Sequence, residues 1–201
     1  MPAEEALDVI AILVGPKGRG SNMVALARAA DEGRVPARVG VVVSPLDGTP
    51  AVENALAIGL HLEIVAPEPL DTYGQRLLGA LHHAGAQWVC LAGYTRLLPQ
   101  EVLRAYPNHV LNIHPALLPK YGGKGMYGMR VHEAVLGSDD TDSGCSVHFV
   151  NEQYDEGAVI LQRRVPRLPG DTPEDLAKRV LEQEHIAYAE ALAKLIHESR
   201  N

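Results

Sequence analysis

Residues 110–121 read Val-Leu-Asn-Ile-His-Pro-Ala-Leu-Leu-Pro-Lys-Tyr, and this stretch decides the fold. It begins as an apolar strand and ends at the prolines, since proline fixes φ and donates no backbone hydrogen bond. Alternation along a strand places Asn112 and His114 on the same side, where the chain leaves the sheet. Ligands of open α/β sheets bind at that carboxyl edge, so we interpret this amide and imidazole as a candidate catalytic pair. A polar strand end that caps itself is the alternative.

Upstream of this stretch, apolar runs alternate with helical patterns. We expect strands over residues 8–14, 37–43, 61–65, 87–92 and 109–111, and helices over 23–32, 50–60, 72–84 and 99–106. Strand and helix alternating at this spacing predict an α/β fold with a doubly wound, mostly parallel sheet and helices on both faces.

The downstream half has a different character. Residues 119–128 are rich in glycine and predict an exposed, mobile loop, to which we assign no residue-level role. A short helix is expected over 131–136, and two strands over 143–150 and 159–165. Thr172 followed by Pro173 predicts the start of a long helix that ends near His197. We find no repeat or linker, so the expectation is a single domain over residues 1–201.

Composition narrows the function classes. The chain has 201 residues, 46% of them hydrophobic, a net charge of −7 and a pI near 5.7, which argues against nucleic-acid binding. No apolar run approaches the ~18 residues that a membrane span needs. The first residues, Met-Pro-Ala-Glu-Glu, are acidic, unlike the start of a signal peptide. Cys90 and Cys145 lie in apolar runs and are expected to be buried thiols. We therefore expect a soluble, cytoplasmic protein.

A glycine-rich segment, Gly18-Arg19-Gly20-Ser21-Asn22, separates the first strand from its helix. Free amides at a helix start favour an anion, so the segment predicts a site for one phosphate group. It is neither a Walker A loop nor a good dinucleotide fingerprint, because Met23 replaces the third glycine and the second strand ends in Ser44. A plain tight turn is the alternative.

Three further features carry possible chemistry. Residues 93–99, Gly-Tyr-Thr-Arg-Leu-Leu-Pro, follow the fourth strand and could form an apolar wall for a ring system, or only a connection. Asp155 could orient a histidine, or simply accept hydrogen bonds within its own loop. Glu184 falls in the apolar row of Leu176, Val180 and Tyr188, so it either has a partner or ligand, or lies at the margin of the row and points to water.

Several motifs together resemble one family. These are Gly-Arg-Gly-Ser-Asn at 18–22, Leu-Ala-Gly-Tyr-Thr-Arg-Leu-Leu at 91–98, Leu-Asn-Ile-His-Pro-Ala-Leu-Leu-Pro-Lys-Tyr at 111–121, Gly-Cys-Ser-Val-His-Phe-Val at 144–150 and Asp-Glu-Gly-Ala-Val-Ile-Leu-Gln at 155–162. In this order they are similar to the phosphoribosylglycinamide formyltransferases, folate-dependent enzymes of purine synthesis. The resemblance extends from about Asp8 to the final helix and implies a Rossmann-like formyltransferase fold.

The resemblance also implies roles for individual residues. Asn112, His114 and Asp155 match the catalytic residues. The implied ribonucleotide contacts are Gly20, Ser21, Asn22 and Glu184, and the implied folate contacts are Tyr94, Arg96, Leu97, Leu98, Val150, Asn151 and Tyr154. Leu181 departs from the family, since relatives place a polar or basic substrate contact there. The loop at 121–128 is longer than in the best-known bacterial relatives.

The implied reaction is direct transfer of a formyl group from 10-formyltetrahydrofolate to the primary amine of glycinamide ribonucleotide. Asn112 would donate a hydrogen bond to the formyl oxygen, and protonated His114, oriented by Asp155, would stabilise the charge and move a proton. We expect no metal, because the nine histidines show no ligand spacing. Small molecules are the expected partners, and the chain is expected to be a monomer or homodimer.

Four other functions remain open. Methionyl-tRNA formyltransferases share the Asn-x-His motif and the aspartate, but they carry a further C-terminal domain and a basic tRNA surface that we do not find in this sequence. A formyltetrahydrofolate hydrolase shares the core and has no use for a phosphate loop. A nucleotide-binding module without catalysis would leave Asn112, His114 and Asp155 without a role. A formyltransferase for another amine is a further alternative.

Overall fold

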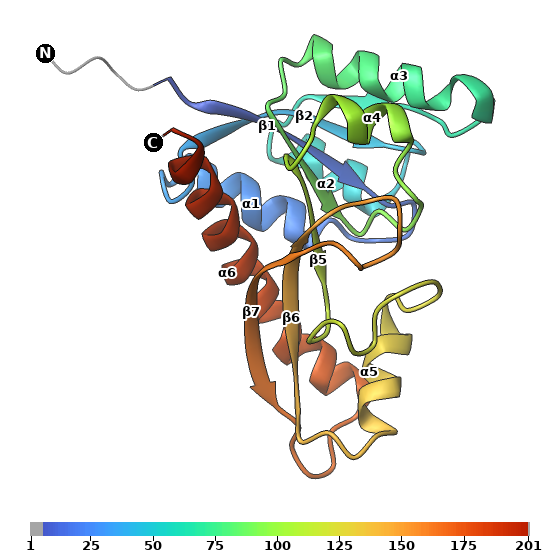
Figure 1. Ribbon diagram of the computed structural model, residues 1–201, viewed down its shortest axis with the longest axis vertical. Helices are drawn as coiled ribbons and strands as arrows, with labels where there is room; N and C mark the ends of the chain where they lie inside the picture. Colours follow the sequence, from blue (N-terminus) through green and yellow to red (C-terminus); the bar gives the residue numbers. More distant parts are fainter. Residues whose placement is uncertain (1–5, 201) are drawn as a thin grey trace, which may run out of the picture.

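The structure is a computed structural model that describes residues 6–200 (Figure 1). All its strands join one sheet in the order β3-β2-β1-β4-β5-β6-β7. Their bounds are β1 (Asp8–Val14), β2 (Ala37–Ser44), β3 (Leu62–Ile64), β4 (Trp88–Ala92), β5 (Val110–His114), β6 (Asp142–Phe149) and β7 (Val159–Pro166). The first five strands pair in parallel, whereas β6 and β7 are antiparallel to their neighbours. The predicted mostly parallel α/β sheet is confirmed.

Helices cover both faces of the sheet. They are α1 (Ser21–Asp31), α2 (Pro50–Ala57), α3 (Leu70–His83), α4 (Gln100–Ala105), α5 (Met129–Leu136) and α6 (Pro173–Ser199). One apolar cluster joins the sheet to α1, α2 and α6, and the other joins it to α3 and α4. Figure 1 shows α3 and α4 together at one end and the long α6 running beside α1, β6 and β7.

Strand β1 shows why long apolar runs were readable as central strands. Ile10 and Ile12 face the first cluster, while Ala11 and Leu13 face the second, so every residue of the strand is buried. Full burial of an aliphatic side chain contributes about 1.5–3 kcal/mol, which makes both faces of this strand stabilising. Cys90 and Cys145 are buried free thiols, as expected.

The start of α6 follows its sequence signals closely. The Thr172 hydroxyl accepts a hydrogen bond from the Asp175 amide at 3.2 Å, and the Asp175 carboxylate accepts one from the Thr172 amide at 3.0 Å. Pro173 occupies the first turn, where its missing N–H costs nothing. These reciprocal bonds satisfy donors that the helix itself leaves open. The predicted helix start is therefore confirmed, and the helix extends to Ser199.

The change from parallel to antiparallel pairing at β5 positions the site. In the β5–β6 register, Asn112 lies opposite His148 and His114 lies opposite Ser146. The hydroxyl of Tyr188 on α6 lies 3.0 Å from both the Leu91 and the Leu111 carbonyl oxygens. These contacts tie α6 to β4 and β5 just before Asn112.

Two expectations concern the limits of the chain and the membrane. The acidic start that argued against a signal peptide lies at residues 1–5, outside the described residues. Within residues 6–200, no helix has both the length and the apolar character needed to cross a membrane.

Candidate active site

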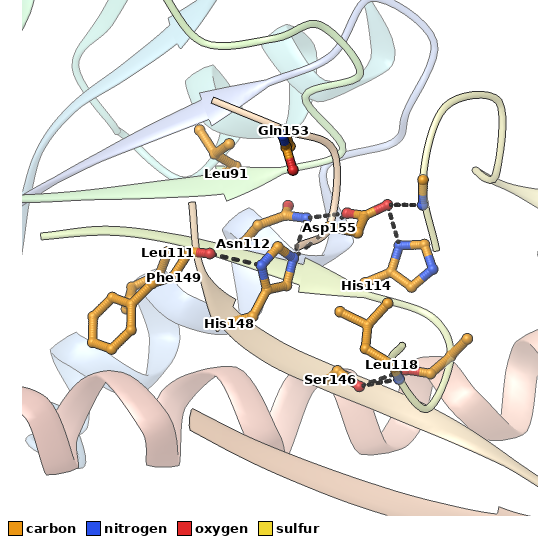
Figure 2. Close-up of polar contacts among 12 residues, drawn as sticks. Leu91, Leu111, Asn112, His114, Leu118, Ser146, His148, Phe149, Gln153 and Asp155 are labelled. Atoms are coloured by element: carbon orange, nitrogen blue, oxygen red, sulfur yellow. Dashed lines mark hydrogen bonds and ion pairs between the residues drawn. The ribbon is translucent and has the colours of Figure 1, made fainter. Parts of the chain in front are cut away.

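The structure brings Asn112, His114 and Asp155 together and adds His148 (Figure 2). One oxygen of Asp155, Oδ2, lies 3.5 Å from Nδ1 of His114. The other, Oδ1, lies 3.5 Å from both Nδ2 of Asn112 and Nε2 of His148. Figure 2 shows the carboxylate placed between the two imidazoles. A carboxylate, an amide and two imidazoles therefore meet at the end of β5.

His114 has both ring nitrogens engaged. Its Nε2 lies 2.7 Å from the Tyr121 carbonyl oxygen, an acceptor, so Nε2 carries the hydrogen and Nδ1 faces Asp155. Burial lowers the pKa of His114, and this effect exceeds the opposing effects of the Asp155 charge and the Tyr121 carbonyl. Burial therefore opposes the protonation of His114 that we expected from Asp155, although both ring nitrogens face acceptors, and that protonation stays a prediction.

Asp155 is ionised at neutral pH. Burial alone raises its pKa, but the neighbouring His148 and His114 imidazoles and the Gly123 amide together hold that pKa below its usual value. The Gly123 amide donates to Oδ2 at 3.0 Å. Asp155 has a left-handed backbone (φ 56°), a conformation that is uncommon outside glycine but that aspartate adopts more often than most residues. The Gly123 contact is consistent with this conformation being held in place.

Sequence reasoning assigned no role to His148. Its Nδ1 donates to the Phe149 carbonyl at 2.8 Å, which leaves Nε2 as an acceptor for Asn112 Nδ2 at 3.1 Å. We favour this pairing over a charged contact with Asp155, because 3.1 Å is within hydrogen-bonding range and 3.5 Å is long. The alternation of Ser146, Val147 and His148 was a readable signal, but only the β6 register places His148 opposite Asn112.

The glycine-rich loop after Pro119 contacts the site at its beginning. The Tyr121 hydroxyl lies 2.7 Å from both Ser138 Oγ and Asp140 Oδ2, and its carbonyl accepts from His114. Gly123 donates to Asp155. Residues 121–123 are partly buried and held by these contacts, so the expectation of an exposed loop is wrong for them, and two of the residues to which we assigned no role contact His114 and Asp155.

The predicted phosphate loop ends at a helix start. Gly20 caps α1 in a left-handed conformation (φ 71°), and no side chain bonds to the first amides of the helix. A Cβ at Gly20 would come within 3.1 Å of the Ala51 side chain, so the position favours glycine by both conformation and space. The open amides of the first turn are suited to an anion.

Asn22 departs from the phosphate assignment. Its Nδ2 donates to Glu184 Oε2 at 2.6 Å, across 162 positions of sequence, and its Oδ1 is buried without a hydrogen-bond partner in the described residues. The side chain is therefore turned to α6 and not to the helix start. Glu184 is 7% exposed, and burial raises the pKa of its carboxyl, opposed by the Asn22 bond. The alternative of a solvent-facing Glu184 is wrong.

A cavity of about 520 Å³ lies where folate contacts were predicted. Its lining includes Arg96, Leu97, Leu98 and Tyr154 among the predicted residues, and Tyr73, Glu101 and Glu152 in addition. Tyr94 lies behind it, with its hydroxyl 3.0 Å from that of Tyr73.

The other two predicted folate residues do not line the cavity. Val150 packs against the cluster beneath α3 and α4, and Asn151 Oδ1 accepts a hydrogen bond from the Gln153 amide. Since Tyr154 precedes Asp155 directly, the cavity and the cluster of Asn112, His114 and Asp155 share one loop.

Among residues 6–200, no group of three or more His, Cys, Asp or Glu side chains is arranged to hold a metal ion.

The fold and this cluster define a class: a doubly wound α/β enzyme with titratable side chains gathered at the carboxyl edge of its sheet. Residues 10–192 match the family described as formyl transferase, and the chain belongs to that family. It is 41% identical over 186 residues to the chloroplastic phosphoribosylglycinamide formyltransferase of Arabidopsis thaliana, covering 90% of this chain and 63% of the relative. The chain thus spans less than two thirds of that plant protein.

Two bacterial proteins are covered more fully. The phosphoribosylglycinamide formyltransferase of Escherichia coli (strain K12) is 34% identical over 88% of this chain and 82% of its own length. The crystal structure of glycinamide ribonucleotide transformylase 1 from Symbiobacterium toebii is 37% identical with a TM-score of 0.89, covering 100% of this chain and 92% of that one.

Proposed function

We propose that this chain, acting as one catalytic domain, transfers the formyl group of 10-formyltetrahydrofolate to the primary amine of glycinamide ribonucleotide. Formyl-glycinamide ribonucleotide and tetrahydrofolate are the products. One observation carries the proposal. The sheet that holds the Asn112, His114 and Asp155 cluster at its edge also packs against the open start of α1 and against α6, which carries the buried carboxylate Glu184. Relatives that carry this activity in their names support it.

The ribonucleotide fits the α1–α6 side of the site. The uncapped amides that begin with Ser21 are suited to its phosphate, and Lys17 and Arg19 are exposed on the same loop. Glu184 is a buried carboxylate whose partner in the described residues is an amide and not a cation. Such a group is suited to accept hydrogen bonds from substrate donors. Half-buried Leu181 contributes no charge, so binding relies on the α1 loop and Glu184.

The folate fits the cavity beside the Asp155 loop. At about 520 Å³ it falls within the range of small-ligand pockets, and Leu97, Leu98 and Tyr154 give it the apolar walls that a ring system needs. Arg96 at the same cavity supplies a positive charge. When bound, 10-formyltetrahydrofolate supplies the formyl group, and the protein supplies orientation and proton transfer.

The geometry assigns the steps to particular atoms. The second Nδ2 proton of Asn112 faces Asp155 at 3.5 Å, too long for a good hydrogen bond, so it is available to the formyl oxygen. Neutral His114 has its Nδ1 lone pair on the Asp155 side. As the amine attacks, His114 takes up its proton, directly or through water. Asp155 and the Tyr121 carbonyl then stabilise the imidazolium, which in turn stabilises the oxyanion. The oxyanion collapses to the new formamide as the bond between the formyl carbon and the folate nitrogen breaks, and His114 returns the proton to that leaving nitrogen.

An assay of tetrahydrofolate release tests the function. Release from 10-formyltetrahydrofolate is measured with and without glycinamide ribonucleotide. The transferase reading predicts release only with the ribonucleotide. Equal release without it, accompanied by formate, would identify a hydrolase, and release with other amines at equal efficiency would identify a different acceptor. We further propose a cytoplasmic location, which cell fractionation tests. We also propose a monomeric or homodimeric state, which gel filtration tests.

A further inference from the structure

Ser146 lies directly opposite His114 in the β5–β6 register and is fully buried. Its hydroxyl donates to the Ala116 carbonyl at 2.6 Å and accepts from the Leu118 amide at 3.0 Å. Figure 2 shows Ser146 beneath the segment that follows His114, with its contact to the Leu118 backbone. A side chain on β6 therefore holds the backbone that leaves β5.

Gln162 completes this arrangement from β7. Its Nε2 donates to Ser146 Oγ at 2.8 Å and to the Leu118 carbonyl at 2.9 Å. A serine hydroxyl has one donor and two acceptor sites, and here all three are used. Ser146 therefore has no free hydrogen-bonding site for a substrate. Any contribution it makes to the reaction must pass through the segment that it holds.

That segment forms a closed connection around His114. It begins at His114 on β5, runs through Ala116 and Leu118, and reaches Tyr121, whose carbonyl accepts from His114 Nε2 at 2.7 Å. Tyr121 has a left-handed backbone (φ 58°), so its carbonyl direction depends on how the segment is held. Ser146 fixes the middle of this connection, at Ala116 and Leu118.

We propose that Ser146, held by Gln162, is a positioning residue for formyl transfer: it fixes the Tyr121 carbonyl so that His114 Nε2 carries the hydrogen and Nδ1 stays turned toward Asp155. Without it, the carbonyl shifts and the imidazole samples other orientations and the other tautomer. A displacement of about 1 Å at a reacting group costs on the order of 10²-fold in rate. The consequence for rate rests on the proposed function, whereas the consequence for the His114 tautomer does not.

The test compares Ser146→Ala with Ser146→Thr, which retains a hydroxyl. The matched control is Ser44→Ala, because Ser44 is also fully buried and bonds a local carbonyl, that of Leu46, at 2.7 Å, but lies on β2. Imidazole ¹⁵N shifts of His114 are measured in each folded variant, with the signal assigned through His114→Asn. If Ser146→Ala fails to fold, Gln162→Met removes only the supporting amide and is measured in its place.

For Ser146→Ala we expect mixed His114 tautomers, an altered pH profile of kcat, and a kcat that is about 10- to 100-fold lower at little-changed KM. Ser146→Thr should restore most of the wild-type kcat, the pH profile and the single tautomer. Ser44→Ala should leave the pH profile and the tautomer unchanged. A single Nε2–H tautomer and an unchanged pH profile in Ser146→Ala, with only the melting temperature lowered, would overturn the proposal. If the wild type had no transferase activity but Ser146→Ala still changed the His114 tautomer, the proposed function would be contradicted and the positioning role of Ser146 would stand.

Discussion

The carboxylate of Asp155 lies 3.5 Å from Nδ1 of His114, although the two residues come from a loop and a strand that are far apart in sequence. The pKa of the carboxyl is lowered, and burial also lowers the pKa of His114, so the proposed mechanism starts from an ionised carboxylate and a neutral imidazole. A neutral base beside a fixed anion is prepared to accept a proton from the attacking amine. The charge pair then forms during the reaction and not before it.

Asp155→Asn removes this anion and keeps the side-chain shape. We expect kcat to fall by about 10²–10⁴-fold, the usual range for a general acid–base contribution, while ribonucleotide affinity is largely retained. Steady-state kinetics and a calorimetric titration with glycinamide ribonucleotide measure the two effects. Glu156→Gln, an exposed acid on the same loop, is the control. A variant that retained full kcat would remove Asp155 from the mechanism.

Glu184→Gln tests the buried carboxylate on α6. The amide keeps the size but loses two lone-pair sites and the charge, so we expect weaker ribonucleotide binding by about 1.5–3 kcal/mol, the range for a hydrogen bond to a charged group. Titration with the ribonucleotide measures it. Glu182→Gln, exposed on the same helix, should change nothing. Unchanged affinity in Glu184→Gln would restrict Glu184 to holding Asn22.

Ser21→Ala combined with Asn22→Ala tests the phosphate side. We expect KM for the ribonucleotide to rise and KM for the folate to remain nearly unchanged, because Ser21 lies at the open start of α1 and Asn22 holds Glu184. Because Asn22 bonds Glu184, the rise in ribonucleotide KM caused by Asn22→Ala should be non-additive with that caused by Glu184→Gln. The rise caused by Ser21→Ala should be additive with it. A rise in the folate KM alone would show that this loop serves the other substrate.

His132 gives the protein a pH-dependent stability. It is buried on α5, its Nδ1 has no hydrogen-bond partner in the described residues, and burial lowers its pKa from 6.5 to about 4. In the unfolded chain His132 therefore binds a proton near pH 6.5, whereas in the folded protein it binds one only near pH 4. Its stabilising contribution is present above pH 6.5 and is lost as the pH falls through that window.

His132→Gln should flatten this dependence in urea unfolding measured between pH 7 and 4. His83→Gln, on the exposed end of α3, should retain the wild-type slope. An identical slope in His132→Gln would show that other groups control acid stability.

The sequence predicted the fold well because the central strands are long apolar runs and because α2 and α6 begin at threonine caps followed by proline. β1 and the start of α6 follow directly from such patterns. Within the site, strand alternation alone placed Asn112 and His114 together. The position of Asp155 depended on the resemblance to a family, since a loop aspartate carries no spacing signal of its own.

The rest of the site depends on pairings that sequence does not encode locally. His148 and Ser146 contribute through the antiparallel register of β5 and β6, and a shift of one residue would turn both away. The Asn22–Glu184 bond joins the first and last helices. The lowered pKa of His114 results from packing around it, which composition and spacing do not reveal.

The most direct test of the account is a double-mutant cycle on formyl transfer itself. Formyl-labelled folate is mixed with glycinamide ribonucleotide, and label in the ribonucleotide is followed for the wild type, Asp155→Asn, His114→Asn and the double variant. If His114 and Asp155 act as a unit, the double variant is only slightly slower than the slower single variant. Losses that multiply would show that the two residues act independently, and would contradict the account.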